Sequence, residues 1–165
     1  MTVKFRHRLA AGGQRLTCRV VLFFLFRALD ALAVRDSRVA AEVAAWPEDR
    51  VLGLVMPGGP QLYIARRGPR LVRLARCDAP QILIAFKSPA DAFYVFTGQM
   101  GVAAAYAQHR FTVRGNVSEA MSFVRCVDVA EGYLFPPFWA NRILKQLPQK
   151  QLSSLRLYGA VLLGR

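Results

Sequence analysis

The stretch Ala105–Met121, AYAQHRFTVRGNVSEAM, combines the end of a helix, a strand, a turn and the start of a second helix. Phe111 and Val113 alternate with polar residues, which is the pattern of a strand buried on one face. Gly115 allows a turn, and Asn116 is a favourable N-cap residue for the helix that follows. The stretch therefore predicts a strand and a capped helix that together bury an apolar layer.

Four strands are expected before this stretch. Arg50–Met56 and Gln61–Arg67 flank a Pro-Gly-Gly turn, and Arg70–Arg76 follows a Gly-Pro turn, so these three segments predict consecutive hairpins. Gln81–Phe86 has apolar residues on both of its faces, which is typical of a strand that is covered on both sides.

Helices are expected after the fourth strand. Ser88 can cap a helix that has Pro89 in its first turn and ends at Gly98, and a short helix follows over Met100–Gln108. The helix after Asn116 has an apolar stripe that consists of Val117, Ala120, Met121, Val124 and Val127. Its solvated face is expected to consist of Ser118, Ser122, Arg125 and Asp128. The sequence thus predicts an α/β (α+β) fold, with a largely antiparallel sheet of about five strands and helices on one face.

The apolar run Arg19–Val34 comes before the first strand. Arg19, Arg27 and Asp30 interrupt it and leave seven consecutive apolar residues, whereas a bilayer span needs roughly 20. At about 100° per residue the charged residues fall on one narrow side of a helix. Two interpretations stay open: the helix is buried against the domain, or it lies in a membrane interface or covers a lipid.

The chain is both basic and apolar. It carries 23 Lys and Arg against 10 Asp and Glu, for a formal net charge of +13, and 54% of its residues are hydrophobic. Nucleic acid and an anionic membrane are the two partner classes that this balance favours, and the apolar excess favours the membrane. The arginines between residues 66 and 76 are not interleaved with aromatic residues, and RFTVRGN does not match an aromatic RNA-binding strand. Nucleic-acid binding remains the alternative function.

Side chains for catalysis are scarce. The two histidines are His7, in a basic segment, and His109, and no nucleophile is spaced to meet either of them. Cys18, Cys77 and Cys126 form no C-x-x-C pair, which favours buried reduced thiols over disulfides or a zinc site. No zinc-protease, phosphate-loop or dinucleotide motif occurs. We expect no enzymatic activity, no cofactor and no metal.

The segment GQMGVAAAYAQHRFTVRGNVSEAMSFV resembles the signature of the sterol carrier protein type 2 family of lipid-transfer proteins, and the resemblance extends over about residues 50–130. The matching positions are Gly98, Ala105, Tyr106, Gln108, Arg110, Phe111, Val113, Gly115, Asn116, Ala120 and Met121. His109 stands where the family usually has a glycine. The N-terminal extension is similar to that of family members that act as accessory factors in bacterial ubiquinone synthesis.

The resemblance implies a lipid carrier without catalysis, located in the cytoplasm and peripherally on membranes, with an apolar cavity for a fatty acyl lipid, a sterol-like molecule or an isoprenoid quinone precursor. Enzymes of lipid synthesis are further expected partners. The predicted divisions are a basic helical extension (residues 1–45), a lipid-binding core (46–133) and a basic helical segment (134–165).

Two sets of contact residues are expected. Those for lipid are Phe93, Phe96, Met100, Tyr106, Phe111, Val113, Met121 and Val124. Those for the membrane surface are Arg15, Arg19, Phe23, Phe24, Phe26, Arg27, Trp139, Arg142 and Lys145. The first set follows from the apolar faces of the predicted elements, and the second from the basic ends of the chain, where Trp and Lys or Arg suit the headgroup boundary.

Overall fold

A five-stranded sheet forms the base of the protein. The structure is a computed structural model that describes residues 2–134 and 157–159, with side chains from residue 12 onward. The strands are β1 (Val51–Val55), β2 (Leu62–Arg67), β3 (Arg70–Leu74), β4 (Ile82–Phe86) and β5 (Phe111–Arg114). They are arranged in the order β3-β2-β1-β4-β5, in which only the β1–β4 pair is parallel. The predicted fold class is confirmed.

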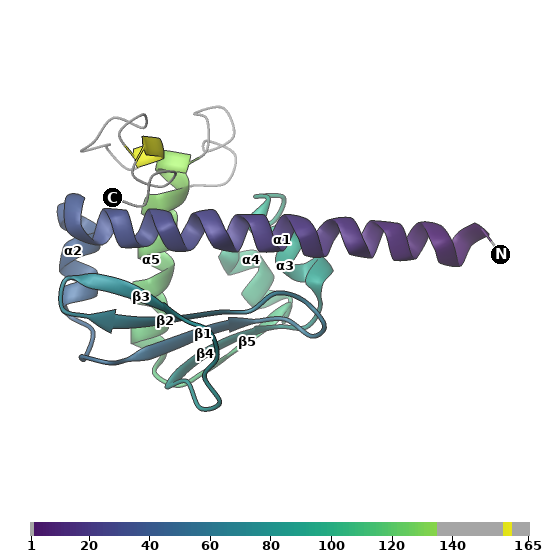
Figure 1. Cartoon of the computed structure of the whole chain (residues 1–165). Helices are drawn as coiled ribbons and strands as arrows, with labels where there is room; N and C mark the ends of the chain where they lie inside the picture. The colour runs from purple at the N-terminus through teal and green to yellow at the C-terminus, as the bar shows by residue number, and fades with distance from the viewer. Residues whose placement is uncertain (1, 135–156, 160–165) are drawn as a thin grey trace.

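Helices lie on one side of this sheet (Figure 1). They are α1 (Thr2–Arg35), α2 (Ser37–Ala44), α3 (Pro89–Phe96), α4 (Val102–Ala107) and α5 (Val117–Leu134). The long helix α1 runs across β3, α3 and α5, and its N-terminal part extends beyond the sheet (Figure 1). The carboxylate of Asp30 fixes α1 over β3, because it accepts hydrogen bonds from the Arg70 guanidinium and from the backbone N–H of Leu71.

Local signals place the elements around β5. The Ser88 hydroxyl accepts the N–H of Asp91 and caps α3, and the Asn116 side chain accepts the N–H of Ser118 and caps α5. Gly115 has φ +98°, and a Cβ there would lie 2.1 Å from the carbonyl oxygen of Gln81, so a larger residue does not fit. His109 has φ +54°, the left-handed conformation that glycine would adopt most readily.

The C-terminal half of α1 belongs to the same core as the sheet. One stripe of α1, which includes Cys18, Leu22, Leu25, Leu29 and Leu32, is buried together with apolar residues of β1, β2 and β4. Side chains three and four positions apart share a helix face, so this stripe is the apolar face of an amphipathic helix. The helix therefore packs against the domain along this side, and exposed apolar residues, Leu16, Val20 and Phe23, lie on the opposite side.

The other side of the sheet has no helix over it in the described part of the chain. Here Val51, Tyr63 and Ala65 form a small separate cluster, and the Tyr63 ring lies across Gly53. Leu83 and Ala85 of β4 are only half-buried, so the expectation that β4 is covered on both sides is wrong. An apolar residue on an outer sheet face can be partly buried by its neighbours alone, which the alternation of a single strand does not reveal.

Candidate ligand-binding site

Aromatic rings gather where β4 and β5 meet α3 and α4. The Phe86 ring lies 5.4 Å from that of Phe96 and 5.3 Å from that of Phe111, measured between centroids. The Tyr106 ring of α4 lies 5.7 Å from that of Phe111. These separations are in the range of favourable aromatic pairs. The cluster joins four elements that follow one another along the chain, β4, α3, α4 and β5.

The cluster changes from buried to exposed along its length. Phe86, Phe96 and Phe111 are each less than 8% exposed, whereas Tyr106 is 56% exposed. The helix that carries Tyr106 is short, and Ala105 is its one buried residue. The cluster therefore forms a continuous apolar path from the core to the surface at α4.

One side of α5 is held by hydrogen bonds. The Trp46 indole donates to the Ser122 hydroxyl at 2.8 Å, and that hydroxyl donates to the Glu42 carboxylate at 2.6 Å. The Arg125 guanidinium donates to the same carboxylate at 2.8 Å. The pKa of Glu42 is lowered because the hydrogen bond from Arg125 stabilises its charged form, against the effect of desolvation. We call this side, with Ser122 and Arg125, the locked side of α5.

The buried face of α5 is rotated around the helix relative to the apolar face predicted from the sequence. Ser122 was expected in solvent and is buried, because Trp46 and Glu42 satisfy its hydroxyl. Val117 and Met121 were expected in the apolar stripe, and Met121 is instead 48% exposed. The residues that α5 buries are Ala120, Ser122, Phe123, Cys126, Ala130, Gly132 and Tyr133. Two exposed apolar residues thus lie outside the core.

The opposite side of α5 carries side chains that the core does not use. At about 100° per residue, five side chains fall within one sector of about 80° that begins opposite Ser122 and lies next to the buried stripe. They are Val117, Met121, Val124, Asp128 and Glu131, which we call the open side of α5. Because Ser122 binds α2, the open side faces away from α2, and Figure 1 shows α2 and α4 on opposite sides of α5. The open side is thus turned toward the part of the molecule where α4 and Tyr106 lie.

The open side also holds two carboxyl groups without an ion-pair partner among the described residues. The other eight of the chain's ten acidic residues each pair with an arginine. Desolvation raises the pKa of Asp128, and desolvation together with the charge of Asp128 raises the pKa of Glu131 to about 8. Asp128 was expected on a solvated face, and its partial burial corrects that expectation.

The lipid-contact residues predicted from the sequence fall into three groups. Phe96 and Phe111 are buried, Phe93, Met100, Val113 and Val124 are half-buried, and Tyr106 and Met121 are exposed. Val113 shares the helix-covered face of β5 with Phe111 because the two residues are two positions apart. The structure brings Phe96, Tyr106 and Phe111 into one cluster around Phe86, which the sequence did not single out.

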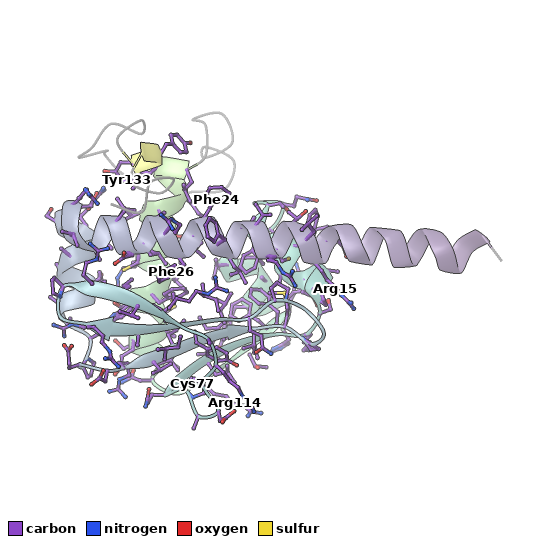
Figure 2. The ribbon with its side chains drawn as sticks, viewed as in Figure 1. Arg15, Phe24, Phe26, Cys77, Arg114 and Tyr133 are labelled. Carbon is purple, nitrogen blue, oxygen red and sulfur yellow. The ribbon has the colours of Figure 1, made fainter. Side chains whose placement is uncertain are left out.

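The membrane-contact residues predicted on α1 also differ in their surroundings. Phe23 is exposed, whereas Phe24 and Phe26 are half-buried and point to opposite sides of the helix (Figure 2). Arg15 is close to Gly58 in the β1–β2 turn, and the Arg27 guanidinium lies 5.6 Å from the centre of the Phe23 ring. Three further predicted residues lie outside the described part of the chain: Trp139, Arg142 and Lys145. Within the described residues, no helix is long and apolar enough to cross a membrane.

Reactive groups near the core are held in their neutral forms. Burial raises the pKa of the Cys18 thiol to about 11 and that of the Cys126 thiol to about 12, so both are protonated at neutral pH. In the part of the chain that the structure describes, no group of three or more His, Cys, Asp or Glu residues is placed to hold a metal ion.

Most arginines of the β2–β3 region are paired. Arg66 bonds Glu48 and the backbone carbonyl of Trp46, and Arg67 pairs with Asp49. In the same region Arg70 pairs with Asp30 and Arg76 with Asp78. Their positive charge is therefore largely compensated within the protein, which weakens the case for a phosphate-binding face.

Comparison with solved structures finds several similar folds. No family model and no curated protein matches the sequence. A solved structure described as the UbiJ-SCP2 ubiquinone synthesis protein has 14% identity and a TM-score of 0.49, and the match covers 76% of this chain and 98% of that chain. Sterol carrier protein 2 like 2 from Aedes aegypti has 12% identity and a TM-score of 0.35, with 58% and 96% covered.

Proposed function

We propose that this protein is a non-enzymatic carrier that binds a hydrophobic ligand and exchanges it at membranes. The observation that carries the proposal is the apolar path that begins at buried Phe86 and Phe111 and ends at exposed Tyr106. A path of this kind presents apolar surface at α4 that is continuous with the core, against which an apolar ligand can pack. Aromatic and methionine side chains also adapt to ligands of irregular shape.

The open side of α5 supports the same proposal. Val117 and Met121 are apolar and exposed, and Val124 is half-buried beside them. Adjacent exposed apolar residues of this kind often mark a binding surface. A long-chain ligand that lies over β5, between α4 and this side of α5, would remove these side chains from water. Each ligand CH₂ group that is buried contributes about 0.8 kcal/mol.

The family that the sequence resembles indicates narrower classes of ligand. A fatty acyl lipid, a sterol-like molecule and an isoprenoid quinone precursor all have the long apolar body that the path requires. In the last case the protein would be an accessory factor in ubiquinone synthesis, working in the cytoplasm and on membranes, and would deliver the precursor to the enzymes of that synthesis.

Extraction of the purified protein with organic solvent, together with native mass spectrometry, tests the proposal. We expect a hydrophobic molecule bound in about a one-to-one ratio, and Phe96→Asp is expected to abolish its retention. Thr112→Asp is a matched control, because Thr112 is exposed on the opposite face of β5 from Phe111. A folded Phe96→Asp protein with its ligand intact would contradict the placement of Phe96 in the site.

Nucleic-acid binding is tested on the same preparation. A gel-shift titration with duplex DNA and single-stranded RNA at low and moderate salt should show no retention at concentrations where the protein carries its lipid. A salt-sensitive shift without any extractable lipid would favour the alternative function.

A further inference from the structure

The side of α1 that faces away from the core carries an apolar stripe of its own. Leu16 is 62% exposed, Val20 is 45% exposed and Phe23 is 43% exposed. These residues are separated by four and three positions, so their side chains lie in a row along the helix. The buried residue Cys18 lies about 200° from Leu16 around the helix, so the row points away from the domain.

The surroundings of this stripe are cationic. Arg19 is exposed beside it, and Arg27 lies over the Phe23 ring at 5.6 Å. The sequence has no acidic residue before Asp30, and the carboxylate of Asp30 is already bound by Arg70. The arginines of α1 up to residue 29 therefore have no unpaired carboxylate on the same helix to neutralise them.

We propose that the stripe of Leu16, Val20 and Phe23 docks α1 onto the surface of an anionic phospholipid bilayer. A helix that buries an apolar row at the headgroup boundary, with arginine beside it, is the usual form of an interfacial helix. The arginines complement the charge of the lipid headgroups, and the part of α1 that extends beyond the sheet leaves room along the helix for a flat surface (Figure 1). This inference refines the proposed carrier function and rests on it for its biological purpose.

The two sides of α1 thus have separate tasks. Cys18, Leu22 and Leu25 hold the helix on the domain, and the opposite stripe contacts the bilayer. The helix can dock without leaving the core, which removes the need to choose between a buried helix and a membrane helix. Phe24 and Phe26 are half-buried against the core and are not part of the docking stripe.

Flotation of the full chain with vesicles tests the docking. The probe is a vesicle of phosphatidylcholine with about one third phosphatidylglycerol, compared with pure phosphatidylcholine. Serine at positions 16, 20 and 23 together (Leu16→Ser, Val20→Ser, Phe23→Ser) is expected to reduce partitioning at least about 100-fold. Val72→Ser is the matched control, since Val72 is an exposed apolar residue on β3, and it should change partitioning by less than about twofold. Arg19→Glu with Arg27→Glu should weaken binding about tenfold at low salt and much less at high salt.

A second measurement does not depend on the folding of the triple variant. Phe23→Trp adds an indole to the stripe, and brominated phospholipid should quench its fluorescence in excess of the wild-type signal. Three results would each overturn the docking: wild-type protein that does not float with anionic vesicles, a folded triple variant that floats normally, or a Phe23→Trp variant whose added indole is not quenched.

Lipid extraction from the same proteins distinguishes a failure of membrane docking from a failure of the carrier function. A triple variant that keeps its bound lipid but no longer floats supports the docking and leaves the carrier site intact. A wild-type chain that floats through the stripe but never contains lipid supports the docking and removes the carrier function.

Discussion

The two sides of α5 differ in how completely their polar groups are satisfied. On the locked side, Ser122 and Arg125 meet Glu42, and at the C-terminal end of the helix the Tyr133 hydroxyl donates to Asp36 at 2.9 Å. On the open side, Asp128 and Glu131 have no ion-pair partner among the described residues. The polar groups on one side of this helix therefore have partners within the protein, whereas the carboxyl groups on the other side have no ion-pair partner among the described residues.

The difference separates stability from binding. Buried polar groups with partners fix the position of α5 against α1 and α2, because losing one partner would leave a desolvated group behind. Exposed apolar groups and desolvated carboxyl groups contribute little to that position. The exposed apolar groups lower the free energy only when something else covers them, as expected of a binding surface, and carboxyl groups with raised pKa values often mark a functional site.

The largest effect on stability is expected from Asp36, the buried carboxylate that binds the C-terminal end of α5 through Tyr133. Asp36 is fully buried, and it accepts hydrogen bonds from Tyr133 and a bidentate pair from Arg38. Desolvation acts to raise the pKa of Asp36, but the hydrogen bonds from Arg38 and Tyr133 outweigh it and lower the pKa. Asp36→Ala should reduce the free energy of unfolding by about 3–5 kcal/mol, measured by urea denaturation. A loss below about 1 kcal/mol would show that the network does not hold the helix.

A charge on the open side should remove the ligand and leave the fold intact. Val124→Asp places a carboxylate on the half-buried part of that side and should reduce bound lipid at least about tenfold. Arg125→Ala, one residue away on the locked side, should cost about 1 kcal/mol of stability and retain the lipid. Equal lipid content in the two variants, measured by mass spectrometry after extraction, would remove the distinction between the sides.

The carboxyl group of Glu131 gives the open side a pH dependence. Its pKa is raised from 4.5 to about 8 by desolvation and by Asp128, so the folded protein retains a proton that the unfolded chain releases near pH 4.5. The free energy of unfolding should therefore fall as the pH rises from about 5 to about 8. Glu131→Gln should remove most of this decrease. The free energy of unfolding of the variant should therefore exceed that of wild type by an amount that grows with pH across that window. Parallel stability–pH curves for the two proteins would contradict the raised pKa.

The smallest effect is expected from a single neutral hydrogen bond on the locked side. Trp46→Phe removes the indole N–H that donates to Ser122, while the Ser122 hydroxyl keeps Glu42 as its acceptor. Stability should fall by about 1 kcal/mol, with lipid content unchanged. Phe is smaller than Trp, so Ser122→Ala serves as a second variant, which removes this bond together with the bond from Ser122 to Glu42. A lipid loss in either variant would mean that the locked side also contacts the ligand.

Much of the fold is predictable because its signals are local. Ser88, Gly115 and Asn116 each specify a cap or turn through their own side chain or backbone, and the structure uses all three as expected. The strand boundaries follow from alternation and turn residues in the same way. The prediction fails where the environment comes from distant residues. Ser122 is buried because Trp46 and Glu42 lie beside it, 76 and 80 positions away in the sequence.

The candidate site is predictable in part for the same reason. Phe96 and Phe111 belong to faces with a clear period, and both are in the aromatic cluster. Glu131 gives no signal in the sequence, because the solvation of a carboxyl group depends on packing and not on its neighbours along the chain. The exposure of Tyr106 likewise depends on how α4 sits against β5, and an apolar pattern in six residues does not determine that orientation.

The location of the ligand is tested most directly by paramagnetic NMR. A spin-labelled fatty acid added to the isotope-labelled full chain should broaden the amide signals of Tyr106, Val113 and Val124. The amides of Ser122 and Arg125 should be broadened less, and those of Tyr63 and Val72 on the outer sheet face should be unaffected. This pattern would place the ligand over β5, between α4 and the open side of α5. Broadening confined to the outer sheet face or to Phe23 on α1, with Val113 and Val124 unchanged, would contradict the account.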